Sequence, residues 1–167
     1  MNAFLSRLDR GLIKIINYLV GISMVILTTI IFIQVIMRYI FKIPIGGVEE
    51  LPVYLMMFSI WLTGIVVARD NNHIKLELLP MFIRSKRVLK LIDLLLMVII
   101  TISLGIFTYL AFKYVHFGYR TGEVSAGLGF PLWWLTSSMF VSGCLMTLYY
   151  IIHIYRLLKE MVKWKSS

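Results

Sequence analysis

The run IINYLVGISMVILTTIIFIQVIM, residues 15–37, holds no charged side chain over its whole length. About 20 apolar residues in a helix, at about 1.5 Å of rise each, cross the roughly 30 Å hydrocarbon core of a bilayer. In lipid the backbone must satisfy its own hydrogen bonds, and this run lacks the alternation of barrel strands. Three similar runs follow in the chain. The pattern therefore predicts an all-α integral membrane protein with four transmembrane helices, at about 15–37, 49–68, 92–112 and 131–153.

The composition is that of a membrane protein with a single domain. Of the 167 residues, 60% are hydrophobic, and the mean hydropathy of +0.88 is well outside the usual soluble range. The four runs and their connections account for the chain, so we expect residues 1–167 to form one four-span domain. The first run is too long for a cleaved signal peptide and has no small-residue cleavage site after it, so we expect it to remain as a span.

The positive charges predict how the chain is oriented. Of the 17 Lys and Arg residues, 13 lie before the first run, between the second and third runs, or after the fourth, and 4 lie in the other two connections. Cytoplasmic segments are enriched in Lys and Arg, so both termini are expected in the cytoplasm. The net charge of +9 is thus a signal for topology and lipid head groups, and no nucleic-acid partner is expected.

The connection between the second and third runs, HIKLELLPMFIRSKRVLKLID at 73–93, has an amphipathic pattern. From Leu78 onward apolar or small side chains recur at helical spacing, whereas Arg84, Arg87 and Lys90 face away from them. We predict an amphipathic interfacial helix between spans two and three; alternatively, the third span starts early with a basic flank. Residues 1–14, basic and partly amphipathic, are likewise expected to lie on the membrane surface.

The interiors of the four runs offer no acidic or basic group for moving a solute. A coupled transporter usually needs an ionisable residue or a broken helix near mid-membrane, where a charged side chain costs about 2.5–3.5 kcal/mol. The uncharged runs at 15–37, 51–68, 94–112 and 131–152 contain no Asp, Glu, Lys or Arg, and Pro52 and Pro131 lie at span starts. We therefore expect that this chain alone transports nothing, with a stand-alone small exporter or channel as an alternative.

Small and polar residues inside the runs predict close helix packing. Ser59 with Thr63 and Gly143 with Thr147 are spaced by four residues, which lets helices approach closely, either within this chain or against another one. Gln34, deep in the first run, is a candidate for a hydrogen bond across helices.

The histidines raise the alternative of a haem-bearing membrane anchor of a redox enzyme. Two axial ligands must face one iron, and on the predicted topology only His73 and His153 share a side of the membrane, both at span ends. There is no zinc-type cluster, nucleophile elbow or Gly-rich phosphate loop. The sequence thus predicts no catalytic residue, no metal site and no cofactor, and we expect that the protein is not an enzyme.

Opposite charges gather at the connection between the first two runs. Arg38 ends the first span, directly after its uncharged run, and Glu49 and Glu50 begin the second span. Arg38 could simply reach head groups while the acids favour a helix N-terminus; alternatively, Arg38 pairs with one glutamate and the other contacts a partner. At the opposite end of the second span, Arg69 and His73 are expected to hold its cytoplasmic end. For all five residues a structural role and a partner contact stay open.

Three segments together resemble the small membrane (DctQ-type) subunit of tripartite ATP-independent periplasmic (TRAP) transporters. They are QVIMRYIFKIPIGGVEEL at 34–51, WLTGIVVARDNNHIKLELL at 61–79 and GLGFPLWW at 127–134. The matching positions are Gln34, Arg38, Phe41, Pro44, Glu49, Glu50, Trp61, Gly64, Ala68, Arg69, His73, Ile74, Pro131 and Trp133. The sequence departs mildly at Glu77, where the family often has Asp.

The resemblance implies a non-catalytic small permease subunit in a bacterial inner membrane. Its partners would be a large multi-span subunit that carries the sodium and substrate sites, and a periplasmic substrate-binding protein. The solute would be an organic acid such as sialic acid or a C4-dicarboxylate. This chain would be a scaffold that anchors the static part of the carrier in the bilayer and helps to dock the binding protein.

Overall fold

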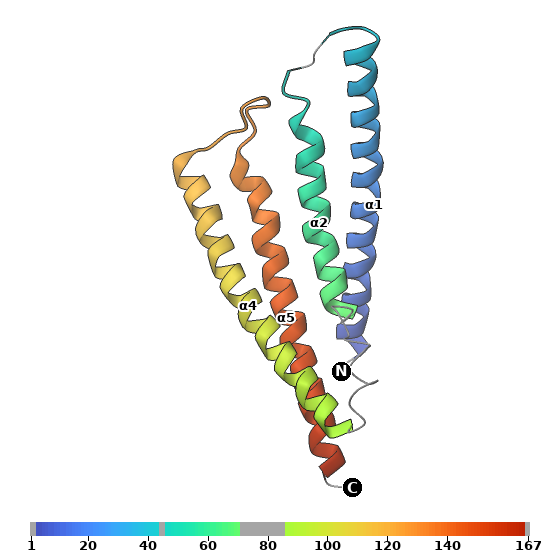
Figure 1. Cartoon of the computed structure of the whole chain (residues 1–167), viewed down its shortest axis with the longest axis vertical. Helices are drawn as coiled ribbons and strands as arrows, with labels where there is room; N and C mark the ends of the chain where they lie inside the picture. Colours follow the sequence, from blue (N-terminus) through green and yellow to red (C-terminus); the bar gives the residue numbers. More distant parts are fainter. Residues whose placement is uncertain (1–2, 44–45, 71–85, 166–167) are drawn as a thin grey trace.

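Four long α-helices make up the part of the protein that the structure describes (Figure 1). The computed structural model describes residues 3–43, 46–70 and 86–165. The helices are α1 (Ala3–Tyr39), α2 (Glu50–Asp70), α4 (Lys86–Thr121) and α5 (Leu132–Lys165). Each contains a segment long and apolar enough to cross a membrane. The predicted all-α fold with four spanning helices is confirmed.

Three of the helices are longer than the spans predicted for them. With 37, 36 and 34 residues, α1, α4 and α5 measure about 50 Å or more at 1.5 Å per residue, so they tilt in a bilayer or extend beyond it. Helix α1 runs unbroken from Ala3, so most of the expected surface segment 1–14 is its first part and not a separate element. Helix α4 continues past His116 to Thr121 and ends where Gly122, at φ +65°, donates its N–H to the Gly118 carbonyl at 3.1 Å.

The predicted interfacial helix falls mostly on residues 71–85, which lie outside the described residues. From Lys86 onward the chain is already α4, which continues without a break into the third span. The described part of this connection is therefore a basic flank of the span, as in the alternative that the sequence left open.

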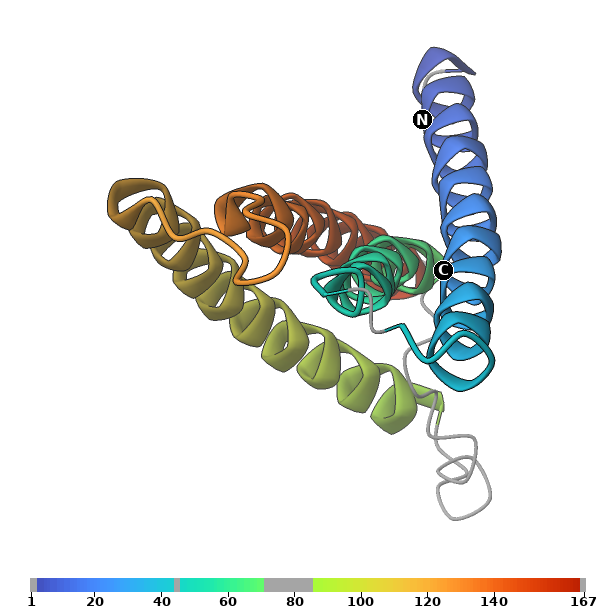
Figure 2. The same ribbon diagram turned by 90° about the horizontal axis from the view of Figure 1, so that it is seen from above.

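The helices pack in the order α4, α5, α2, α1. Helix α5 contacts both α4 and α2, and α2 also contacts α1. Figure 2, a view from above, shows α5 and α2 between the two flanking helices. Successive helices run in opposite directions, so both termini lie at one end, which we call the terminal end; the connections 40–49 and 122–131 lie at the other, the loop end (Figure 1).

Small hydroxyl and glycine residues lie where helices meet inside this chain. The hydroxyl oxygens of Ser23 on α1 and Ser59 on α2 are 2.6 Å apart. On α5, a Cβ added at Gly143 would lie 2.7 Å from Oγ1 of Thr108 on α4. Gln34 donates through Nε2 to the Val48 carbonyl at 2.6 Å, across the α1–α2 connection. These positions serve packing within this chain, one of the two possibilities that the spacing left open.

The buried core is small and sits where α1, α2 and α5 meet. Ile13 and Ile16 of α1 and Ile65 of α2 are buried there, with partly buried apolar residues of α5 packed around them. Elsewhere large apolar side chains are exposed along the flanking helices, for example Phe32 on α1 and Ile102 on α4. Soluble proteins rarely expose apolar surface on this scale, so these faces require lipid or another protein.

Candidate functional site

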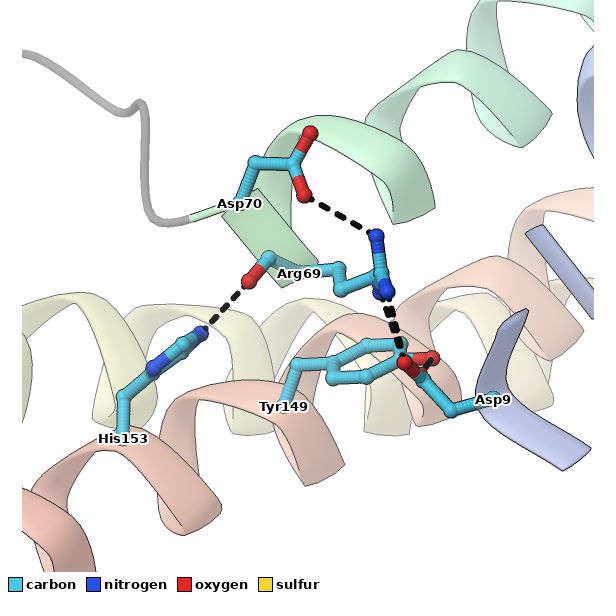
Figure 3. A network of polar contacts seen from close by, with 5 residues as sticks. All are labelled: Asp9, Arg69, Asp70, Tyr149 and His153. Atoms are coloured by element: carbon cyan, nitrogen blue, oxygen red, sulfur yellow. Dashed lines mark hydrogen bonds and ion pairs between the residues drawn. The ribbon is translucent and has the colours of Figure 1, made fainter. Parts of the chain in front are cut away.

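A group of polar side chains joins three helices at the terminal end. Its members are Asp9 of α1, Arg69 and Asp70 of α2, and Tyr149 and His153 of α5, and we call it the terminal cluster (Figure 3). Arg69 donates through Nε to Asp9 Oδ2 at 2.8 Å, and its Nη2 lies 2.8 Å from the same oxygen. Its Nη1 donates to Asp70 Oδ1 at 3.2 Å. The guanidinium therefore lies between two carboxylates and links α1 to the end of α2.

Helix α5 completes the terminal cluster with two side chains four residues apart, on one face of the helix. The Tyr149 hydroxyl donates to Asp9 Oδ1 at 2.6 Å, so both oxygens of Asp9 accept hydrogen bonds from other helices. His153 Nε2 lies 2.9 Å from the Arg69 carbonyl oxygen. A carbonyl only accepts, so Nε2 carries the hydrogen in this contact. This bond satisfies one of the open carbonyls at the C-terminal end of α2.

A second group, the loop cluster, joins the two connections at the loop end. It consists of Glu50 and Tyr54 in the first turns of α2, and Ser125 and Gly127 in the α4–α5 connection. Glu50 accepts hydrogen bonds from the Tyr54 hydroxyl at 2.9 Å, from the Gly127 N–H at 2.9 Å and from the Ser125 hydroxyl. One carboxylate thus holds the α4–α5 connection against the start of α2.

The backbone at the loop cluster approaches so closely that side chains are excluded. Gly47, at φ +84°, lies against Gly127, and a Cβ on either residue would collide with backbone atoms of the other. The loop that carries Gly127 is folded on itself: Ser125 N donates to the Phe130 carbonyl at 2.8 Å, and Leu128 N donates to Ser125 Oγ at 3.0 Å. The contact is therefore between two ordered turns, and glycine is required on both sides.

The five residues singled out from the sequence have different surroundings. Glu50 is in the loop cluster and Arg69 is in the terminal cluster. Arg38 and Glu49 are exposed at the loop end, and within the described residues no ion pair joins Arg38 to either glutamate. His73 lies outside the described residues.

Seven members of the two clusters were missed as site residues: Asp9, Asp70, Tyr149 and His153 of the terminal cluster, and Tyr54, Ser125 and Gly127 of the loop cluster. Asp9 is the one acid in a basic N-terminal segment, and Tyr149 and His153 share one face of the last helix. Those signals were available, but no spacing in the sequence says that they meet Arg69.

Both clusters can hold helices together, and their charged groups are already engaged within the chain. The Asp9 and Arg69 side chains are 25% and 28% exposed, so their pairing is partly shielded from water. In the middle of the helices, Thr63, Thr101 and Thr108 donate to carbonyls four residues earlier in their own helices. Among the described residues, no group of three or more His, Cys, Asp and Glu side chains could hold a metal. The arrangement is suited to fixing helix positions.

Comparison with known proteins places this sequence in a family. The family model described as "Tripartite ATP-independent periplasmic transporters, DctQ component" matches residues 27–160. The match includes the whole loop cluster and the α2 and α5 members of the terminal cluster, and Asp9 precedes it. No curated protein sequence matches the chain. The resemblance seen in the three sequence segments is confirmed.

Proposed function

This chain belongs to the DctQ family, the small membrane component of TRAP transporters, and we propose that it braces the large transport subunit of such a carrier. It is a transporter component and not an enzyme. In our proposal the large subunit carries sodium and an organic acid, such as sialic acid or a C4-dicarboxylate, and a periplasmic protein delivers the acid. The chain itself holds a fixed position in the bacterial inner membrane while its partner moves.

The observation that carries this proposal is the placement of charge. Every Asp, Glu, Lys and Arg lies outside the uncharged runs that form the middle of the four spans. Within the described residues, the charged members of the two clusters are paired with groups of this chain. A carrier needs ionisable or open backbone groups near mid-membrane, and this chain supplies none of the acidic or basic ones.

The two clusters also support a static role. They join the α1–α2 hairpin to the α4–α5 hairpin at both ends, so neither hairpin can rotate against the other without breaking several hydrogen bonds. A brace must keep its shape while another subunit moves. The exposed apolar faces of α1 and α4 leave a wide surface on which a large membrane subunit could pack.

The exposed charges at the loop end are our candidates for partner contacts. If both termini are cytoplasmic, as the distribution of Lys and Arg suggests, the loop end faces the periplasm. Arg38 and Glu49 then lie where a periplasmic binding protein or the large subunit can reach them, and Glu50 holds the neighbouring loop in place.

Affinity purification from native membranes tests the partnership. We expect a tagged chain to bring along one large multi-span protein, and expect Arg38→Gln with Glu49→Gln to reduce the yield of a partner without changing the fold of the chain. Lys159→Gln, at an exposed charge of α5 at the terminal end, is the control. Recovery of the chain alone under conditions that preserve other membrane complexes would contradict the proposal.

A further inference from the structure

A groove runs between α1 and α5 at the terminal end, beside the terminal cluster. Its cavity volume is about 1180 Å³, and Arg69 and Asp70 at the end of α2 also line it. Pockets that hold drug-sized molecules measure roughly 300–1,000 Å³, so the groove is large enough for an extended ligand.

The walls of the groove are apolar. Leu12 and Ile15 contribute from α1, and Leu148 and Ile152 contribute from α5. Leu12, Ile15 and Leu148 are exposed, although all four residues belong to segments apolar enough to span a membrane. An exposed apolar wall within a span calls for a hydrocarbon neighbour.

The polar end of the groove is rich in arginine. Three arginines line it, against two aspartates. Arg69 is held by both Asp9 and Asp70. Arg7 of α1 and Arg156 of α5 lie on opposite sides of the groove and are exposed, and Arg156 also interacts electrostatically with Asp9. An anionic group between α1 and α5 would therefore meet two guanidinium groups, each able to bind phosphate oxygens.

We propose that this groove binds one anionic phospholipid. Its phosphate contacts Arg7 and Arg156, and one acyl chain lies along Leu12, Ile15, Leu148 and Ile152. The lipid fills the space between α1 and α5 and so extends the contact that Asp9 makes with Tyr149.

Charge complementarity favours a lipid over a helix of another protein. Basic pockets between transmembrane helices are suited to phospholipid head groups, and one Arg near an anionic lipid surface favours binding by a factor of about five. A phospholipid places one anionic group directly beside an apolar chain, which matches a groove with arginines at one end and apolar walls beyond. The terminal end also carries most of the Lys and Arg residues, as expected for a side that faces anionic lipid.

Photolabelling of the full-length protein tests the site. The protein is placed in phosphatidylcholine nanodiscs that contain phosphatidylglycerol with a photoactivatable group on its acyl chain, and adducts are mapped by mass spectrometry. We expect adducts to concentrate on Leu12, Ile15 and Leu148 over Ile102 and Ile106, which are also exposed apolar residues but lie on α4. An equivalent phosphatidylcholine probe should label the groove several-fold less.

Two pairs of variants separate the site from general lipid contact. Arg7→Gln with Arg156→Gln should lower groove labelling by about fivefold for each arginine, while Arg120→Gln at the loop end should not change it. Leu148→Trp should block the acyl chain, whereas Ile102→Trp should leave groove labelling intact. For the groove variants, unchanged labelling of α4 shows that the protein is still inserted.

Equal labelling of the groove and α4, or equal labelling by the two lipids, would overturn the proposal. The same holds if the groove is labelled in nanodiscs but shielded by another polypeptide in native membranes, because its occupant would then be a protein.

Discussion

Asp9 of α1 and Arg69 of α2, 60 residues apart in the chain, are joined by an ion pair of 2.8 Å. Tyr149 of α5 donates to the other oxygen of the same carboxylate at 2.6 Å. One acid near the N-terminus thus holds three helices together at the terminal end, and at the loop end Glu50 holds the α4–α5 connection against the start of α2. These contacts fix α2 at both ends, in agreement with the static role that we propose.

Neutralising Asp9 should weaken the packing of α1 against α2 and α5. We expect Asp9→Asn to lower the free energy of unfolding by about 1–2 kcal/mol, because Arg69 and Tyr149 lose a charged acceptor. The pair is about a quarter exposed, so the loss stays below that of a fully buried ion pair. Unfolding of the purified protein in detergent micelles measures it.

A double-mutant cycle provides the control for this pair. Asp9→Asn and Arg69→Gln together should cost less than the sum of the two single changes, whereas Arg38→Gln at the exposed end of α1 should combine additively with either one. Additive effects of Asp9→Asn and Arg69→Gln would show that the ion pair does not hold the helices.

The two adjacent glutamates should behave differently. Glu50→Gln removes the charge and replaces one of the two oxygens that accept from Ser125, Tyr54 and Gly127 with an NH2 group. We therefore expect amide hydrogens at residues 125–129 to exchange roughly tenfold faster, the equivalent of about 1.4 kcal/mol. Glu49→Gln changes an exposed side chain and should leave that exchange unaltered. If the two variants give the same exchange rates, Glu50 does not hold the loop.

The Gly47–Gly127 contact should not tolerate a methyl group. Gly127→Ala places a Cβ against the backbone of Gly47, so the α4–α5 connection must move away from α2. We expect cleavage of this connection by a protease to become several-fold faster. Gly46→Ala, where nothing lies within 4 Å of the added Cβ, is the matched control and should resist cleavage like the wild-type protein.

Two buried serines offer a further comparison. Ser59 bonds to Ser23 on α1, so Ser59→Ala should destabilise the protein by about 0.6–1.7 kcal/mol. The buried Ser142 hydroxyl has no hydrogen-bond partner among the described residues, so Ser142→Ala should be neutral or stabilising. A larger loss for Ser142→Ala than for Ser59→Ala, measured by thermal unfolding in detergent, would contradict these assignments.

Hydropathy was sufficient to predict the number of spans and their approximate positions. A segment that crosses lipid must be a long, uncharged helix, regardless of which other helices it contacts. It did not predict where the helices end. Helix α4 continues beyond its apolar run to Thr121 and ends at Gly122, which has a positive φ. A hydropathy pattern shows where a helix stops being apolar, but it does not show where the helix ends.

The partners of the charged residues could not be predicted from local spacing. Arg38 and Glu50 are close in sequence and opposite in charge, yet Glu50 accepts from Ser125 and Gly127, 75 and 77 residues away. The helices are apolar on all sides, so their periodicity does not indicate which faces meet. Contacts such as Asp9 with Tyr149 follow from the packing order of the helices, which only the structure supplies.

The central claim is that this chain braces a carrier and moves nothing itself, and solute uptake into liposomes tests it most directly. Vesicles are prepared with this chain alone, with its large subunit alone and with both, each with a sodium gradient, the periplasmic binding protein and a panel of organic acids. We predict no uptake with this chain alone and the highest uptake with both subunits. Sustained, saturable uptake by vesicles that contain only this chain would contradict the account.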